Sequence, residues 1–244
     1  MNILNVFTRP KTDSEDLYEV FWSSRREGAG RLEVEIRDQK LTEYRAEVAE
    51  LAAIRYLIVD RQIFNKAFSG PGLKLVTAQP EVCCMIEPGY TNSASRYATY
   101  FPIRHRGMTV ELDSGVARLI DEKRLEDTSL VVSTPELEIV DVPAIGPVAI
   151  TKHAIDQYIR KSTDGAPTKD PWKSLCKRLC NPDLILVDLA LRPKLAKLVK
   201  YGKVQGGLGQ MYRHPTSTLH FQVTDKDEKG VRHLVTVFER LPGK

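Results

Sequence analysis

The 244-residue sequence has no run of apolar residues that approaches the roughly 20 needed to cross a bilayer. Its first 16 residues lack the basic start and the apolar centre of a signal peptide. Only four cysteines are present, far fewer than disulfide-rich secreted domains contain. We therefore expect a cytoplasmic protein that does not contact membranes.

Metal and cofactor motifs are also missing. The cysteines form two pairs, Cys83 with Cys84 and Cys176 with Cys180, and neither pair has the C-x2-C spacing typical of zinc sites. Free cysteines are more often small buried side chains than ligands. The glycines at 206, 207 and 209 lack the GxGxxG spacing of a phosphate-binding loop. We expect reduced thiols, no metal and no cofactor.

Charge is divided unevenly along the chain. Residues 1–147 contain 18 Lys and Arg against 23 Asp and Glu, a net charge of −5, whereas residues 148–244 contain 18 against 9, a net charge of +9. A region this basic suits polyanion binding, because each neutralised phosphate releases counterions. A merely solubilising surface is the alternative. We predict nucleic-acid binding by the C-terminal half, and a surface for a protein partner on the acidic N-terminal half.

The N-terminal half, residues 1–142, is predicted to form a mixed α/β domain. Tyr18–Trp22 is rich in aromatic and β-branched residues, and Arg31–Arg37 alternates apolar with charged residues, so both are expected to be strands. Thr42 is the expected N-cap of a helix that ends near Asp60. Its buried face is expected to contain Tyr44, Val48, Leu51, Ala52 and Ile58. Leu73–Thr77 is a further strand.

This order of elements over residues 17–82 resembles the first part of a ribonuclease H-like fold. Tyr44-Arg45-Ala46-Glu47-Val48 is similar to the helix motif of that family, in which the Glu binds a metal ion. Val20–Ser24 and Leu75–Gln79 stand where the family has strands ending in Asp-Gly-Ser and Thr-Asp-Ser. Two-metal catalysis needs several clustered carboxylates. The resemblance therefore implies an inactive scaffold, because Ser23 and Ala78 replace two of them.

Between residues 80 and 143 the pattern predicts a basic turn, Arg104-His105-Arg106-Gly107, a short helix over Gly115–Arg124, and strands over Arg96–Phe101, Met108–Leu112, Ser129–Ser133 and Glu136–Val142. Pro143-Ala144-Ile145-Gly146-Pro147 discourages regular structure, and the charge balance changes sign there. We therefore predict a linker at residues 143–149 between two domains.

The C-terminal domain, residues 150–244, is predicted to begin with helices. Thr151 is a good N-cap for the first helix, in which His153, Gln157 and Arg160 line the side opposite the apolar residues. Asp170 is expected to cap a second helix that stops at Asn181-Pro182. Leu184–Leu191 fits a strand or a helix, and a further helix is predicted from Pro193.

An antiparallel meander is predicted next, with strands at Gln210–Arg213, Thr218–Val223 and Val231–Arg240. Helices followed by a small antiparallel sheet make a compact α+β domain. The expected fold class is therefore α+β, with a ribonuclease H-like N-terminal domain and a small helical plus antiparallel-sheet C-terminal domain.

This C-terminal order resembles the RelE-like ribonuclease toxins and related bacterial domains with a His-Ala-x-x-Arg motif. His153-Ala154-Ile155-Asp156 matches the start of that motif, and Gln157 replaces its Arg. The resemblance implies metal-independent cleavage of RNA rather than DNA. Such cleavage needs a base, an acid and a cation for the phosphate, and His titrates near neutrality. The candidate catalytic residues are His153, Arg160, His214 and His220, each of which also fits an ordinary surface position.

Candidate contacts to nucleic acid come from the basic side chains of the predicted helices and the meander. They are Lys152, Lys161, Lys173, Lys177, Arg178, Lys194, Lys197, Lys200 and Arg213. The alternative to an enzyme is a non-enzymatic regulator or interaction protein built on inactive nuclease-like folds. Nucleic-acid cleavage in EDTA distinguishes the two hypotheses.

Overall fold

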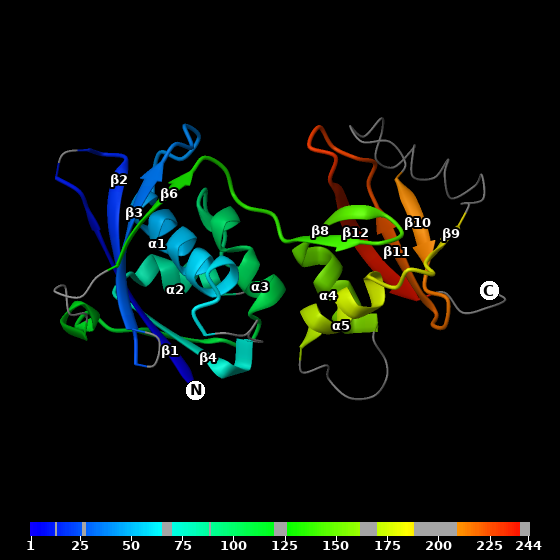
Figure 1. Ribbon diagram of the computed structural model, residues 1–244, viewed down its shortest axis with the longest axis horizontal. Coiled ribbons are helices and arrows are strands. Elements are labelled where there is room, and N and C mark those ends of the chain that lie inside the picture. The colour runs from blue at the N-terminus through cyan, green and yellow to red at the C-terminus, as the bar shows by residue number, and fades with distance from the viewer. Residues whose placement is uncertain are drawn as a thin grey trace. The chain divides into compact units, whose positions relative to one another are not determined.

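The computed structural model describes residues 1–12, 14–25, 28–64, 70–87, 89–119, 126–161, 170–187 and 209–239. The chain divides into two compact units, Met1–Glu136 and Leu137–Lys244, and each contains its own sheet and helices (Figure 1). The molecule is thus mixed α/β with two sheets, which agrees with the coarse α+β class expected from the sequence.

The first sheet has six strands in the order β5-β4-β1-β2-β3-β6. β1, β2 and β3 form an antiparallel meander, whereas β4 pairs in parallel with β1, β5 with β4, and β6 with β3. The strands are β1 (Asn2–Pro10), β2 (Leu17–Ser24), β3 (Gly28–Ile36), β4 (Leu73–Thr77), β5 (Thr109–Leu112) and β6 (Glu126–Val132).

Helices of the first unit connect the strands after β3. The main helix is α1 (Arg45–Arg55), which continues as a single π-helical turn over Tyr56–Asp60. The shorter ones are α2 (Pro80–Ile86), α3 (Tyr100–Arg104) and 3-10 turns at Gly70–Gly72, Ser95–Ala98 and Val116–Leu119.

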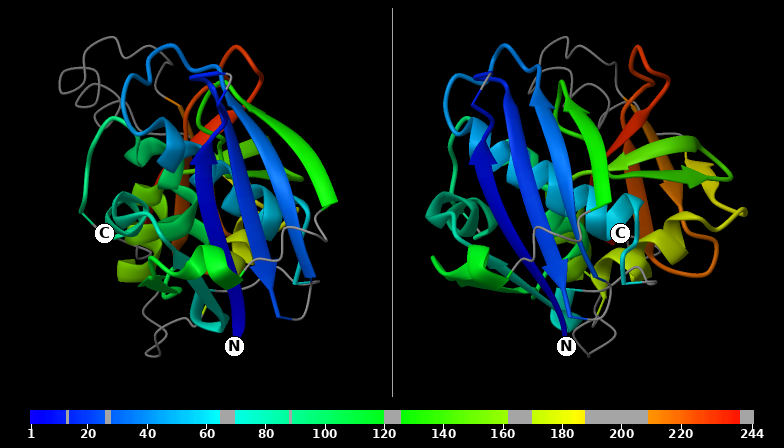
Figure 2. Two further views of the ribbon diagram at one scale, coloured as in Figure 1. Left: turned by 90° about the vertical axis from the view of Figure 1, so that its left-hand side faces the viewer. Right: turned by 60° about the vertical axis from the view of Figure 1, so that its left-hand side comes forward.

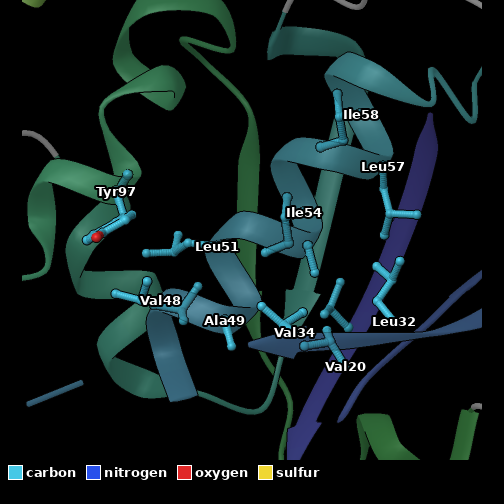
Figure 3. Packing of buried hydrophobic residues seen from close by; sticks show 14 of the residues in the cluster. Val20, Leu32, Val34, Val48, Ala49, Leu51, Ile54, Leu57, Ile58 and Tyr97 are labelled. Carbon is cyan, nitrogen blue, oxygen red and sulfur yellow. The ribbon is translucent and has the colours of Figure 1, made fainter. Parts of the chain in front are cut away.

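α1 packs its apolar face on the sheet, and this contact forms the core of the first unit (Figures 2 and 3). Leu51 and Ile54 of α1 are fully buried together with Val20 and Leu32 of the strands. Burying an aliphatic side chain of this size contributes about 1.5–3 kcal/mol. Repeated over the buried cluster, this packing fixes α1 on β1, β2 and β3.

The first unit contains one strand that was not predicted, and two local expectations for it were wrong. Asn2–Pro10 forms a strand that the sequence pattern did not reveal. α1 begins at Arg45 after Tyr44, whose φ of 59° stops the helix there, so Thr42 is not its cap. Arg96–Phe101 was expected to be a strand but contributes to a 3-10 turn and to α3, because its buried aromatic residues follow a helical spacing.

The second unit has a six-stranded sheet in the order β7-β8-β12-β11-β10-β9. β8 and β12 are parallel, and the other neighbours are antiparallel. The strands are β7 (Ile139–Val142), β8 (Gly146–Ile150), β9 (Ile185–Val187), β10 (Gln210–Arg213), β11 (Leu219–Val223) and β12 (Arg232–Glu239). The predicted meander is β10-β11-β12.

Residues 143–149 are not an extended linker. β7 and β8 form a hairpin there, and Gly146 supplies the φ of 94° that the turn requires. Ile150 donates its N–H to the carbonyl of Glu138 at 2.8 Å, which extends the pairing. The division between the units therefore lies earlier, between Glu136 and Leu137.

Both predicted helix caps of the second unit are confirmed. The Thr151 hydroxyl accepts from the N–H of Ala154 at 3.1 Å and begins α4 (Lys152–Lys161), and it also donates to the carbonyl of Leu234 at 2.8 Å. Asp170 accepts from the N–H of Lys173 at 2.9 Å and begins α5 (Pro171–Leu179). α4 packs on β12 and α5 packs on α4.

Within the described ranges, no helix has both the length and the apolar character needed to cross a membrane. The predicted helix from Pro193, with Lys194, Lys197 and Lys200, lies outside the described residues.

Candidate nucleic-acid interface

α4 exposes its basic residues on the face predicted from its sequence. Ala154, Ile155 and Tyr158 are buried, whereas His153 and Arg160 are exposed and Gln157 between them is half-buried. Lys152 and Lys161 are also exposed at the two ends of the helix. The helical face expected for His153 and Arg160 is therefore present, and their catalytic role stays a prediction.

α5 is divided in the same way. Leu175 and Leu179 are buried, while Lys173 and Lys177, one turn apart, are exposed and Arg178 is half-buried. Lys and Arg extend far from the backbone, so two lysines at i and i+4 can contact neighbouring phosphates on one strand. α5 therefore supplies a compact pair of cations.

Little negative charge competes with these cations on the helices themselves. α4 and α5 each contain three Lys or Arg, and Asp156 is the one acidic residue within their bounds. Asp156 forms an i, i+4 ion pair with Lys152 at 2.8 Å. Asp170 lies just before α5, where its carboxylate caps the helix. The helix pair is thus locally cationic.

A hydrogen bond holds the two helices together. The hydroxyl of Tyr158 in α4 and that of Ser174 in α5 lie 2.7 Å apart, and Tyr158 is fully buried. Burial of the ring and a satisfied hydroxyl together restrict the relative movement of α4 and α5. The contact therefore helps to hold in place the two helices that carry the cations.

Arg213, His220 and Phe238 form a row across the second sheet. Arg213 of β10 is the register partner of His220 in β11, which in turn is the partner of Phe238 in β12. Antiparallel partners place their side chains on the same face, with Cβ atoms about 4.5–5.5 Å apart. Arg213 is exposed, whereas His220 is buried, with 5% of its surface exposed.

The ring of His220 is held at two points. It stacks on Phe238 with ring centroids 5.4 Å apart, and its Nδ1 lies 2.9 Å from the carbonyl oxygen of Thr218. A carbonyl only accepts, so Nδ1 of His220 carries a proton and donates it to this oxygen. The strand predicted at Thr218–Val223 is present as β11, but His220 is buried there rather than at an ordinary surface position.

His214 is held differently and lies beside α5. Its Nδ1 is 3.3 Å from the backbone N–H of Thr216, which donates to it. Burial lowers the pKa of His214, and the nearby Arg178 lowers it further. His214 is therefore neutral at physiological pH, with its proton on Nε2. His214 directly follows β10, and its backbone N–H donates to the carbonyl of Leu219 at 3.0 Å.

The predicted catalytic residues have different neighbours, and their joint role stays a prediction. Arg178 acts on His214, and Arg213 is the register partner of His220. His153 and Arg160 stand on the exposed side of α4. The phenol of Tyr212 in β10 donates to Gln210 at 2.8 Å. His233 lies 3.4 Å from the carboxylate of Asp227.

In the first unit, Glu50 occupies a position that sequence reasoning missed. It is fully buried where α1 meets β1 and β4, and it accepts hydrogen bonds from the hydroxyls of Thr8, at 2.6 Å, and Thr77. Glu47, the residue suggested by the resemblance, is only half-buried one turn earlier. The sequence did contain a signal for this burial, because Glu50 lies among the apolar residues of the predicted helix face.

β1 runs parallel to β4, and Thr8 and Thr77 of these two strands donate their hydroxyls to Glu50 of α1. Ser23 accepts from Asn5 at 3.2 Å, on the opposite face of the sheet from Val6 and Trp22.

Within the described part of the chain, no group of three or more His, Cys, Asp or Glu is arranged to hold a metal ion. Comparison of the chain with models of protein families, with curated proteins and with solved structures finds no match.

Proposed function

We propose that the second unit binds nucleic acid, RNA in preference to DNA, through the exposed cations of α4 and α5. The observation that carries this proposal is the local excess of cations on two helices whose spacing is fixed by Tyr158 and Ser174. Phosphate contacts of this kind supply most non-specific affinity. Arg213, exposed on β10, is a further cation of the same unit.

Binding can be measured by fluorescence anisotropy with labelled single-stranded RNA, duplex RNA and DNA in EDTA, over a range of salt concentrations. Lys173→Gln with Lys177→Gln should weaken binding of every sequence. The slope of log affinity against log salt should fall by roughly 2, because each lost phosphate contact removes about one unit.

A matched control is Lys226→Gln with Lys229→Gln. These two lysines are equally exposed and belong to the same unit, but they lie in the turn before β12 beside Asp225, Asp227 and Glu228. The control should leave affinity and salt slope unchanged. Equal losses of affinity in the two double variants would show that only the net charge of the unit matters, and not the cations of α5. Absence of binding by the unchanged protein at low salt would overturn the proposal.

Metal-independent ribonuclease activity is a second candidate function of the same unit. Its support is the pairing of His220, whose Nδ1 donates to the carbonyl of Thr218, with the cationic Arg213 as its register partner. A base for the 2′-hydroxyl and a cation for the phosphate are two of the three groups such cleavage needs. The strand order β8-β12-β11-β10, with β8 and β12 parallel, is consistent with a RelE-like sheet.

Cleavage of labelled RNA in EDTA tests this function. If the site is catalytic, Arg213→Ala and His220→Gln should each abolish cleavage while much of the binding remains. Binding without cleavage by the unchanged protein would instead favour the non-enzymatic regulator.

For the first unit we propose a ribonuclease H-like scaffold without catalytic activity. The sheet order β5-β4-β1-β2-β3 and its strand directions support this fold. Thr8 and Thr77 where α1 meets the parallel strands support the loss of two-metal catalysis. Hydrolysis of an RNA–DNA hybrid in Mg²⁺ or Mn²⁺ would contradict this assignment. The role that we propose for this acidic unit is to bind a protein partner.

A further inference from the structure

Glu50 joins three elements of the first unit through one carboxyl group. Its Oε2 accepts from Thr8 of β1 and its Oε1 accepts from Thr77 of β4, while its own backbone belongs to α1. All three residues are buried, Glu50 and Thr77 completely. Thr77 is itself fixed, because its hydroxyl accepts from the N–H of Gln79 at 3.0 Å. The contact therefore ties the helix to two parallel strands.

Burial outweighs the support that a negative charge on Glu50 receives: the hydroxyls of Thr77 and Thr8 donate to the carboxyl and lower its pKa, but the cost of desolvation is larger. Among the described residues, no Lys or Arg pairs with it, and the two partners of its oxygens are neutral hydroxyls. The titratable groups that act on it are Glu47, one turn earlier in α1, and Cys83 of α2. Both become negative on losing a proton. An ionised carboxylate here lacks water and a counter-ion, which is costly.

We propose that Glu50 is a pH-sensitive latch: when protonated it holds α1 on β1 and β4, and when it loses its proton this attachment weakens. A protonated carboxyl fits the site because it can share its own proton with a threonine oxygen while still accepting. The latch concerns the first unit alone and does not depend on nucleic-acid binding.

The direction of the pH effect follows from proton linkage. Burial raises the pKa of Glu50 from its ordinary 4.5 to about 7. We call the state in which α1 is held on β1 and β4 the closed state. A group with a raised pKa in the closed state stabilises that state fully when the pH is below the ordinary pKa of the group. This stabilisation is lost as the pH rises from the ordinary pKa to the raised pKa of the closed state. The opening equilibrium constant should thus rise roughly 10-fold per pH unit between about pH 5 and 7, and then level off.

Hydrogen exchange of the full-length protein measures this opening. After correction for intrinsic exchange rates, the protection of α1 amides should fall roughly 10-fold per pH unit from pH 5 to 7 and flatten above it. Glu50→Gln should make protection independent of pH, since the amide can accept from one threonine and donate to the other. Glu47→Gln is the matched control on the same helix and should retain the pH dependence.

A direct titration guards against failure of Glu50→Gln to fold. The carboxyl carbon of one Glu in the unchanged protein, followed by nuclear magnetic resonance, should titrate close to pH 7. Titration of every Glu below pH 5 would overturn the latch. So would α1 protection that is constant from pH 5 to 7, or that loses its pH dependence in Glu47→Gln and keeps it in a folded Glu50→Gln protein.

Discussion

The hydroxyl oxygens of Tyr158 and Ser174 lie 2.7 Å apart and join α4 to α5 inside the second unit. Tyr158→Phe keeps the ring in place and removes this bond, which should lower the free energy of unfolding of the unit by about 1 kcal/mol. Urea unfolding measures the loss. Affinity for nucleic acid should also fall, because the cations of the two helices lose their fixed spacing.

A double-mutant cycle separates this bond from other effects. Ser174→Ala in the Tyr158→Phe background should cost much less than Ser174→Ala alone, because the partner has already been removed. If the two single costs simply add, the two hydroxyls do not stabilise each other and the interpretation is wrong.

Local signals account for the parts of the fold that the sequence predicted well. Thr151 and Asp170 each precede a helix and cap it through their own side chains, so a few neighbouring residues suffice to place α4 and α5. The strand predicted at Thr218–Val223 is likewise present as β11 (Leu219–Val223). The exposed cations of α4 and α5 follow from the same helical period.

Long-range pairing accounts for most of what was missed. Asn2–Pro10 is a central strand because β2 and β4, distant from each other in sequence, pair on its two sides. The hairpin of β7 and β8 replaces the expected linker because β8 also pairs with β12. Glu50 gained its partners only through the β1–β4 pairing, and no nearby residue indicated them.

Asp38 should control the acid stability of the first unit. It accepts from the hydroxyl of Tyr97 at 2.6 Å and from Arg96, and the Tyr97 hydrogen bond above all lowers the pKa of this buried carboxyl. A lowered pKa gives stability that is present above the ordinary pKa of 3.8 and is lost as pH falls below it. Asp38→Asn should destabilise the unit at pH 7 by about 1–3 kcal/mol.

Thermal unfolding at several pH values checks this prediction. The difference between Asp38→Asn and the unchanged protein should shrink as the pH falls from 5 toward 2. Asp16→Asn is the comparison, because Asp16 pairs with Arg45 at a side chain that is 59% exposed, where an ion pair contributes little. A deficit in Asp38→Asn that persisted undiminished at pH 2 would argue against the charge as its cause.

Gly30 allows Trp22 to pack in the first sheet. The two residues are register partners, and a Cβ at position 30 would lie 2.5 Å from the indole Nε1. Trp22 is 1% exposed, so its ring has little room to move. Gly30→Ala should therefore cost about 1–3 kcal/mol through overpacking and alter the near-ultraviolet circular dichroism of the protein. Gly115→Ala, which would meet only the side chain of Asp113, should change both much less.

Asp170 should contribute to the stability of the second unit and to the position of its basic residues. Its carboxylate accepts from the N–H of Lys173 at 2.9 Å and caps α5. Asp170→Ala should lower the free energy of unfolding by about 1 kcal/mol, because the first turn loses its cap.

Asp183→Ala, which removes an exposed carboxylate beyond the end of α5, controls for the change in charge. Both variants gain one net positive charge, so their binding of RNA separates charge from order. If the cap orders Lys173, Asp170→Ala should bind more weakly than Asp183→Ala, whereas equal affinities would show that only the charge matters.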